Sequence, residues 1–152
     1  MDNSALVNMI DRYNSLSYAH NYIIGFSDDN KVYAVITDSN ILPLVCKLDR
    51  GSRNNGNSLR FIPTKKQKAI LKTLNPFFVC TVEDFNNQLQ SFRYNRGELF
   101  EKLVTEFFGQ EWKKDFIPFT VAGDIVINNI PYQIKFERAT FVTEGTLERL
   151  SA

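Results

Sequence analysis

The chain lacks much of the chemistry that common enzyme classes require. Its single histidine, His20, excludes a multi-histidine zinc site, and no nucleophile motif accompanies it to indicate a serine or cysteine hydrolase. The two cysteines, Cys46 and Cys80, have no metal-binding spacing, so we expect buried free thiols in a reducing cytoplasm. The sequence contains no P-loop, no G-x-G-x-x-G motif and no internal repeat.

Long apolar runs are also absent. No stretch of about 18 apolar residues occurs, so we expect no transmembrane helix and no membrane partner. Asp2, with no basic segment before an apolar run, argues against a secretory signal and favours a cytoplasmic protein. The 43% hydrophobic and 23% charged fractions are typical of a soluble globular chain, and 152 residues suffice for one domain with a sizeable core.

Periodicity and turn residues predict an α+β fold with a mixed β-sheet flanked by helices. Residues 27–30 predict a hairpin turn, and Thr64 and Thr81 are expected to cap helices. No proline- or glycine-rich linker separates an N-terminal region, 1–90, from the segment 91–152, so we expect one compact unit. The expected helices are 3–16, 64–74, 82–90, 94–108 and 143–150, and the expected strands are 22–26, 31–37, 41–48, 59–62, 77–81, 116–121, 125–127 and 132–136.

A second hairpin is predicted near the C-terminal end. Asn128 and Asn129 tolerate positive φ between two apolar runs, which is a hairpin signal. Pro131 cannot donate to the β-ladder, so we expect it to be the first residue of the second strand.

This hairpin brings three polar side chains together. Asp124 opens its first strand, while Gln133 and Lys135, two residues apart on the second strand, point to the same face. Carboxylate and carbonyl oxygens suit Mg²⁺, and a lysine beside the metal can orient or deprotonate the attacking water. The trio therefore predicts a metal site for phosphodiester cleavage.

The predicted helix over 94–108 offers a second carboxylate. Its apolar residues lie on one side at helical spacing, and Glu101 lies at the rim of that stripe, beside Phe108. Glu98 lies further round, toward water. Glu101 is therefore the better placed of the two to reach a site beside the sheet.

Together these motifs resemble the PD-(D/E)xK nuclease superfamily, especially its Mrr-like and Holliday-junction-resolvase-like branches with Q-x-K. The resemblance rests on Gly97 and Glu101 in the helix, on Asp124, and on Gln133 with Lys135. It implies a restriction-endonuclease-like core in the C-terminal half, with Asp124, Gln133 and Glu101 holding Mg²⁺ or Mn²⁺. Lys135 would then be the catalytic lysine, and DNA the substrate.

The resemblance covers residues 93–142 and is incomplete beyond them. The family's core continues with a helix and another strand, whereas only residues 136–152 follow Lys135. We expect that an N-terminal strand substitutes, that a partner chain completes the sheet, or that the chain is trimmed. Each residue also has an ordinary structural interpretation: Asp124 as a turn cap, Lys135 as edge-strand protection, and Glu101 as part of a solvated helix face.

A basic segment is the second functional signal. Residues 47–72 hold eight basic residues against Asp49, a balance of +7, so the rest carries −6 of the overall +1. Such a segment indicates contact with a polyanion, although a solvated loop and an ordinary basic helix face would look the same. The expected DNA-binding residues are Arg50, Arg53, Arg60, Lys65, Lys66 and Lys68.

Two functions follow from these observations. The first is a magnesium-dependent DNA endonuclease, with a homodimer as a candidate assembly because double-strand cutting needs two active sites. The second is a catalytically inactive nuclease-like protein that binds DNA or inhibits a protein partner, as phage accessory or anti-defence proteins do. The neutral Gln133 favours the second, since each carboxylate lost from a site weakens its attraction for Mg²⁺.

Overall fold

The computed structural model describes residues 21–49, 58–113 and 124–139. The helices expected at 3–16 and 143–150, the strand expected at 116–121, and the loop with Arg50 and Arg53 lie outside the described residues.

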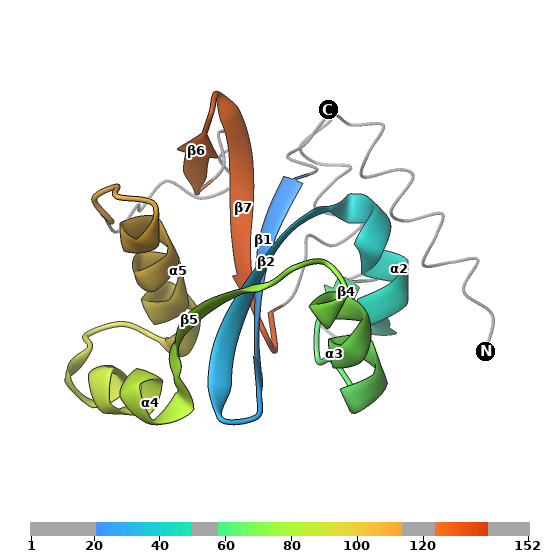
Figure 1. The fold of residues 1–152 in the computed structure, drawn as a ribbon, viewed down its shortest axis with the longest axis horizontal. Helices are drawn as coiled ribbons and strands as arrows, with labels where there is room; N and C mark the ends of the chain where they lie inside the picture. The colour runs from blue at the N-terminus through green and yellow to red at the C-terminus, as the bar shows by residue number, and fades with distance from the viewer. Residues whose placement is uncertain (1–20, 50–57, 114–123, 140–152) are drawn as a thin grey trace.

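The described chain is an α+β structure built on a mixed, five-stranded sheet in the order β5-β2-β1-β7-β6 (Figure 1). A separate two-stranded sheet joins β3 and β4. Within the described residues no helix is long and apolar enough to cross a membrane. The strands are β1 (Asn21–Asp28), β2 (Lys31–Asp38), β3 (Lys47–Asp49), β4 (Ser58–Arg60), β5 (Phe77–Thr81), β6 (Ile125–Ile127) and β7 (Ile130–Phe136). The helices are η1 (Ser39–Ile41), α2 (Leu42–Val45), α3 (Lys65–Lys72), α4 (Val82–Ser91) and α5 (Arg96–Phe107).

Strand β1 lies at the centre of the large sheet. It pairs antiparallel with β2 along the whole hairpin and parallel with β7, where Tyr22 lies opposite Gln133 and Gly25 opposite Phe136. Strands from both halves of the sequence therefore share one sheet.

The sheet separates two apolar clusters, with α2 and α3 on one side and α4 and α5 on the other (Figure 1). We call these the α3 face and the α5 face. On the α3 face the sheet contributes Tyr22, Ile24, Phe26 and Val35. On the α5 face it contributes Ile23, Val32, Ala34, Ile134 and Phe136.

Local sequence explains most turns and helix starts. Asp29 and Asn30 have φ of 51° and 61°, and Asn128 and Asn129 have φ of 51° and 68°, as two-residue hairpin loops between right-twisted strands require. Both predicted hairpins are confirmed. The predicted caps are confirmed too: the Thr64 side chain accepts from the Gln67 N–H in a capping box, and the Thr81 side chain accepts from the Asp84 N–H.

Two predictions about strands are wrong. The segment 41–48 is not one strand: after η1 it forms the short helix α2, and only Lys47–Asp49 is extended. Asp38 initiates this change, because its side chain accepts a hydrogen bond from the Asn40 N–H and caps η1. Pro131 is the second residue of β7, not the first; it lies opposite Val126, and pairing with β1 begins only at Gln133, so no ladder bond is lost.

Gly25 is the position where the α5 face leaves no room for a side chain. A Cβ atom there would lie 2.2 Å from the Phe100 ring, which is fully buried and stacked on Phe136 at 4.8 Å between ring centroids. The ring cannot retreat without disturbing that stack. We expect Gly25→Ala to lower the free energy of unfolding by about 1–3 kcal/mol, measured by urea denaturation.

Gly97 provides the matched control for this substitution. A Cβ atom at Gly97 would meet only the Asn95 side-chain oxygen at 3.5 Å, an ordinary contact, in the first turn of α5. Gly97→Ala should therefore leave stability unchanged or raise it by about 0.5 kcal/mol. Equal destabilisation by both changes would contradict the packing account.

Candidate functional site

Asp124 is fastened to β7 by two hydrogen bonds. Its N–H donates to the Tyr132 carbonyl at 2.8 Å, and its carboxylate Oδ2 accepts from the Ile134 N–H at 2.9 Å. The second bond occupies the ladder position that β6, which begins at Ile125, does not reach. The Asp124 carboxylate is thus held at the edge of β7, on the backbone of the residue that precedes Lys135.

Gln133 and Lys135 share a face, as the alternation of β7 predicts. They lie opposite Tyr22 and Ile24 of β1, whose side chains belong to the α3 face. Their neighbours Ile134 and Phe136 point to the α5 face. Both polar side chains are half-buried, because the sheet continues beside them into β1.

Glu101 approaches β7 from the other side. Helix α5 buries Leu99, Phe100 and Val104 against the α5 face, and Glu101 lies half-buried at the flank of that apolar stripe. Phe107 lies two turns after Phe100 on the apolar stripe, and its ring stacks on Phe77 of β5 at 4.5 Å between centroids.

The charges of Asp124 and Glu101 both act on the Lys135 ammonium. Burial lowers the pKa of the Lys135 ammonium from its ordinary value of 10.5, and the negative charges of Asp124 and Glu101 act in the opposite direction. Desolvation is the largest of these effects. The carboxylates of Asp124 and Glu101, both predicted as site residues, therefore act on the same lysine.

The oxygen donors of this set suit a hard cation. Asp124 and Glu101 supply carboxylates, and Gln133 supplies an amide oxygen on the face of Lys135, which are the ligand types Mg²⁺ takes together with several waters. In the part of the chain that the structure describes, no three His, Cys, Asp or Glu side chains form a metal-binding group. The oxygen donors considered for the site are therefore the carboxylates of Asp124 and Glu101 and the amide of Gln133.

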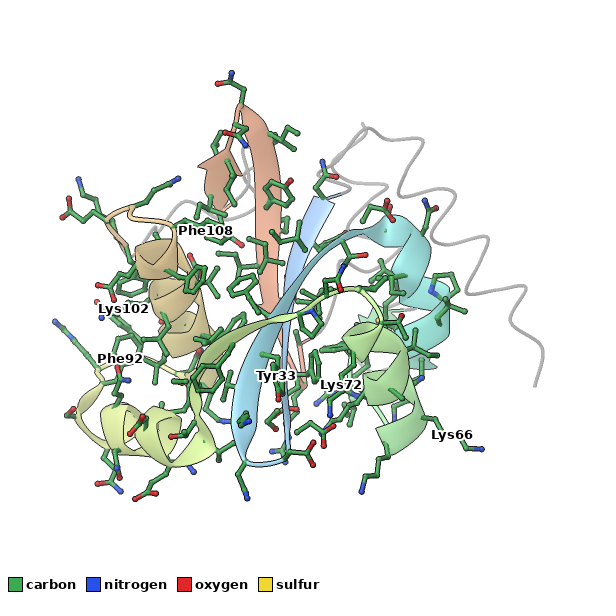
Figure 2. The ribbon with its side chains drawn as sticks, viewed as in Figure 1. Tyr33, Lys66, Lys72, Phe92, Lys102 and Phe108 are labelled. Carbon is green, nitrogen blue, oxygen red and sulfur yellow. The ribbon has the colours of Figure 1, made fainter. Side chains whose placement is uncertain are left out.

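Four basic residues of the segment 47–72 lie on α3: Lys65, Lys66, Lys68 and Lys72. Lys65 and Lys66 are exposed on the helix and Lys68 is half-buried there, while Arg60 lies at the end of β4. Lys72, which is labelled in Figure 2, differs from them. Its ammonium pairs with Asp28 at 2.6 Å and Asp29 at 3.0 Å, so it connects α3 to the β1–β2 turn. Arg50 and Arg53 lie outside the described residues.

The two cysteines are poor nucleophiles. Cys46 is buried and Cys80 is half-buried, and both thiols are free. Burial raises the pKa of Cys46 to about 12 and also raises the pKa of Cys80. Neither lies among the residues of the candidate site.

Glu137, two residues after Lys135, has partners on two other elements. Its carboxylate accepts from the Ser27 hydroxyl at 2.8 Å and the Ser27 N–H at 3.3 Å, and it pairs with Arg96 at 3.5 Å. The only signal in the sequence was the continuation of the polar alternation past Lys135. The next residue, Arg138, is exposed and has a φ of 72°.

Comparison with known proteins adds no relative to this geometry. No protein-family model, curated protein or solved structure matches the chain. The function is therefore inferred from the site itself.

The opposing influences on Lys135 can be separated by titration. We expect the Lys135 pKa, followed by the ¹³Cε shift in NMR, to lie below 10.5, and to fall further in Asp124→Asn or Glu101→Gln, because each carboxylate raises it. Between the lowered pKa and 10.5, the lysine holds its proton in the unfolded state but not in the folded state. The free energy of unfolding therefore rises with pH over that range.

Glu106→Gln is the control on the same helix, since Glu106 pairs with Lys102 at 2.8 Å instead. It should leave the Lys135 pKa unchanged. An unchanged or higher Lys135 pKa in Asp124→Asn would show that the two charges are not coupled.

Proposed function

We propose that this protein is a Mg²⁺- or Mn²⁺-dependent DNA endonuclease with a restriction-endonuclease-like core. The observation that carries the proposal is the placement of Asp124 on the strand that bears Gln133 and Lys135, where its carboxylate accepts from the Ile134 N–H at 2.9 Å. The charges of Asp124 and Glu101 both act on the Lys135 ammonium. Catalytic sites commonly contain groups whose pKa is perturbed by burial and by neighbouring charges, as the pKa of Lys135 is.

Each residue has a distinct role in this proposal. Asp124, Gln133 and Glu101 would hold the cation, which supplies an activated water and stabilises charge on the phosphate. Asp124 is pre-positioned by its hydrogen bond to the Ile134 N–H. Lys135 orients the attacking water, and its lowered pKa makes loss of a proton to assist that water less costly.

The sheet topology supports a complete core. The family that the motifs resemble has a further strand beyond the Q-x-K strand, and here β1 lies beside β7 in parallel orientation. Of the possibilities left open by the sequence, substitution by an N-terminal strand is the one that agrees with this pairing. A homodimer remains part of the proposal for double-strand cutting.

The proposed DNA surface lies on the same side of the sheet as the lysine. Gln133 and Lys135 lie opposite β1 residues of the α3 face, and Leu71 of α3 is buried in that same cluster. The exposed Lys65 and Lys66 extend from this helix (Figure 2 labels Lys66). A duplex held by these cations would lie beside the face of β7 that carries the lysine, and its phosphates would supply most of the affinity.

Cleavage of plasmid and branched DNA is the direct test. With Mg²⁺ or Mn²⁺ we expect cutting that EDTA abolishes and that Asp124→Asn and Lys135→Ala each reduce by roughly 100-fold or more, because each removes stabilisation specific to the transition state. The metal should also raise the melting temperature of the parent protein, and Asp124→Asn should remove that shift.

Lys102→Ala is the matched control, because Lys102 carries a similar charge on α5 but pairs with Glu106. It should cut at the parental rate. Cleavage that survives Asp124→Asn would overturn the site, and a folded parent without activity on any DNA would favour the alternative function.

The alternative is a nuclease-like protein that binds DNA or a protein partner without cleaving. Among the described residues, no three His, Cys, Asp or Glu side chains form a metal-binding group. This favours the alternative, because a site with fewer carboxylates attracts Mg²⁺ more weakly. This alternative retains the basic surface and requires no metal.

DNA binding is tested by charge reversal on α3. We expect Lys65→Glu, Lys66→Glu and Lys68→Glu together to weaken binding and to reduce the slope of log K against log salt by about 2 to 3, one phosphate contact for each lysine. The measurement is fluorescence anisotropy over a salt series.

A control variant with the same net charge separates local from global effects. Reversal at Lys31, Arg93 and Lys113, which are exposed and lie outside α3, should change the slope little. Equal losses in both triple variants would mean that α3 is not the DNA surface.

A further inference from the structure

Glu137 joins three elements at the end of β7 opposite to the hairpin. Its side chain is only 14% exposed and bonds to both the hydroxyl and the N–H of Ser27, near the end of β1. It also pairs with Arg96, the first residue of α5. The Arg96 guanidinium lies over the Phe136 ring, 5.1 Å from its centroid, which fixes the direction of the arginine.

Contacts along α5 show that the helix runs antiparallel to β7. At its start, Arg96 meets Glu137; further along, the Phe100 ring stacks on Phe136. Just past its end, the Gln110 amide donates to the Val126 carbonyl in β6. Later residues of the helix therefore lie beside earlier residues of the hairpin.

This arrangement sets the level of Glu101 along the strand. From Arg96 to Glu101 the helix rises roughly 7.5 Å over five residues. From Glu137 back to Lys135 the strand rises roughly 6.7 Å over two residues. A helix anchored at Arg96 and Glu137 thus carries Glu101 to the level of Lys135, in agreement with the charge of Glu101 acting on that lysine.

We infer that Glu137 is a positioning residue, which, through Arg96 and Ser27, fixes the register of α5 on β7 and so sets Glu101 at the level of Lys135 along the strand. This inference rests on the proposed function, because the site it serves is the proposed metal site. A half-buried charge pair is well suited to fixing a register, because shifting the helix by one turn would leave the Glu137 carboxylate without Arg96. An apolar contact would not impose that cost.

The experiment compares Glu137→Gln and Glu137→Ala with the parent protein. Glutamine retains an acceptor for Ser27 but loses the charge that holds Arg96, whereas alanine loses both. Lys72→Met is the control, since it breaks an ion pair between α3 and the β1–β2 turn that does not involve α5.

The register is measured first, without metal, from NMR contacts between the Phe100 and Phe136 rings. We expect these contacts to weaken in Glu137→Gln and to be lost or replaced in Glu137→Ala, while contacts across β1 and β2 persist. Unchanged Phe100–Phe136 contacts in Glu137→Ala would overturn the inference whatever the activity of the protein. Loss of the β1–β2 contacts as well would mean that Glu137 supports the whole fold, which also overturns it.

Catalysis is measured next. We expect kcat to fall roughly tenfold to a hundredfold in Glu137→Ala with KM unchanged, because DNA binding is carried elsewhere and only the site geometry is lost. The kcat of Glu137→Gln should lie between those of the alanine variant and the parent, and the kcat of Lys72→Met should equal that of the parent. A shifted register with parental kcat would show a structural role alone and overturn the inference.

Failure of the metal site and failure of the Glu137 role give different results. If the parent protein does not cleave DNA and EPR detects no Mn²⁺ binding, the proposed function is overturned. The positioning role of Glu137 in that site is then overturned as well. A parent that cleaves, with Glu137→Ala cleaving equally well, would overturn only the role of Glu137.

Discussion

The parallel pairing of β1 with β7 is the constraint on which the rest of the structure depends. It joins the N-terminal hairpin to the C-terminal hairpin in one sheet, and it buries Ile23, Ile24 and Phe26 of β1 completely. A strand covered on both faces and paired on both edges has apolar residues at consecutive positions, as β1 does. Because each residue of β7 faces a fixed partner, this pairing also decides which face of the sheet receives Lys135.

In the proposed site, burial favours loss of the Lys135 proton and the charges of two carboxylates oppose that loss. The two carboxylates belong to different elements. Asp124 is supplied by the edge of the same hairpin, whereas Glu101 is supplied by a helix packed on the opposite face. The proposed site therefore depends on how α5 packs on the sheet, and the Glu137 contacts are proposed to fix that packing.

Features that depend on neighbouring residues were predictable. The Asn128-Asn129 turn, the caps at Thr64 and Thr81, and the shared face of Gln133 and Lys135 all follow from backbone sterics, short hydrogen bonds or strand alternation. The segment 41–48 was predicted wrongly because a short apolar run fits a strand and a buried helical turn equally well. The structure resolves the ambiguity in favour of a turn of helix that places Leu42 and Val45 against the α3 face.

The sequence alone determined which residues share a face within each element, and hence proposed Glu101, Asp124, Gln133 and Lys135 as one set. It could not determine that β1 would lie beside β7, or at what level α5 would cross the sheet. Those choices depend on contacts between residues far apart in the chain, such as Ser27 with Glu137, and on the fit of the Phe100 ring over Gly25. Periodicity describes one element at a time, whereas register and seating are decided by packing between elements, so only the tertiary structure fixes them.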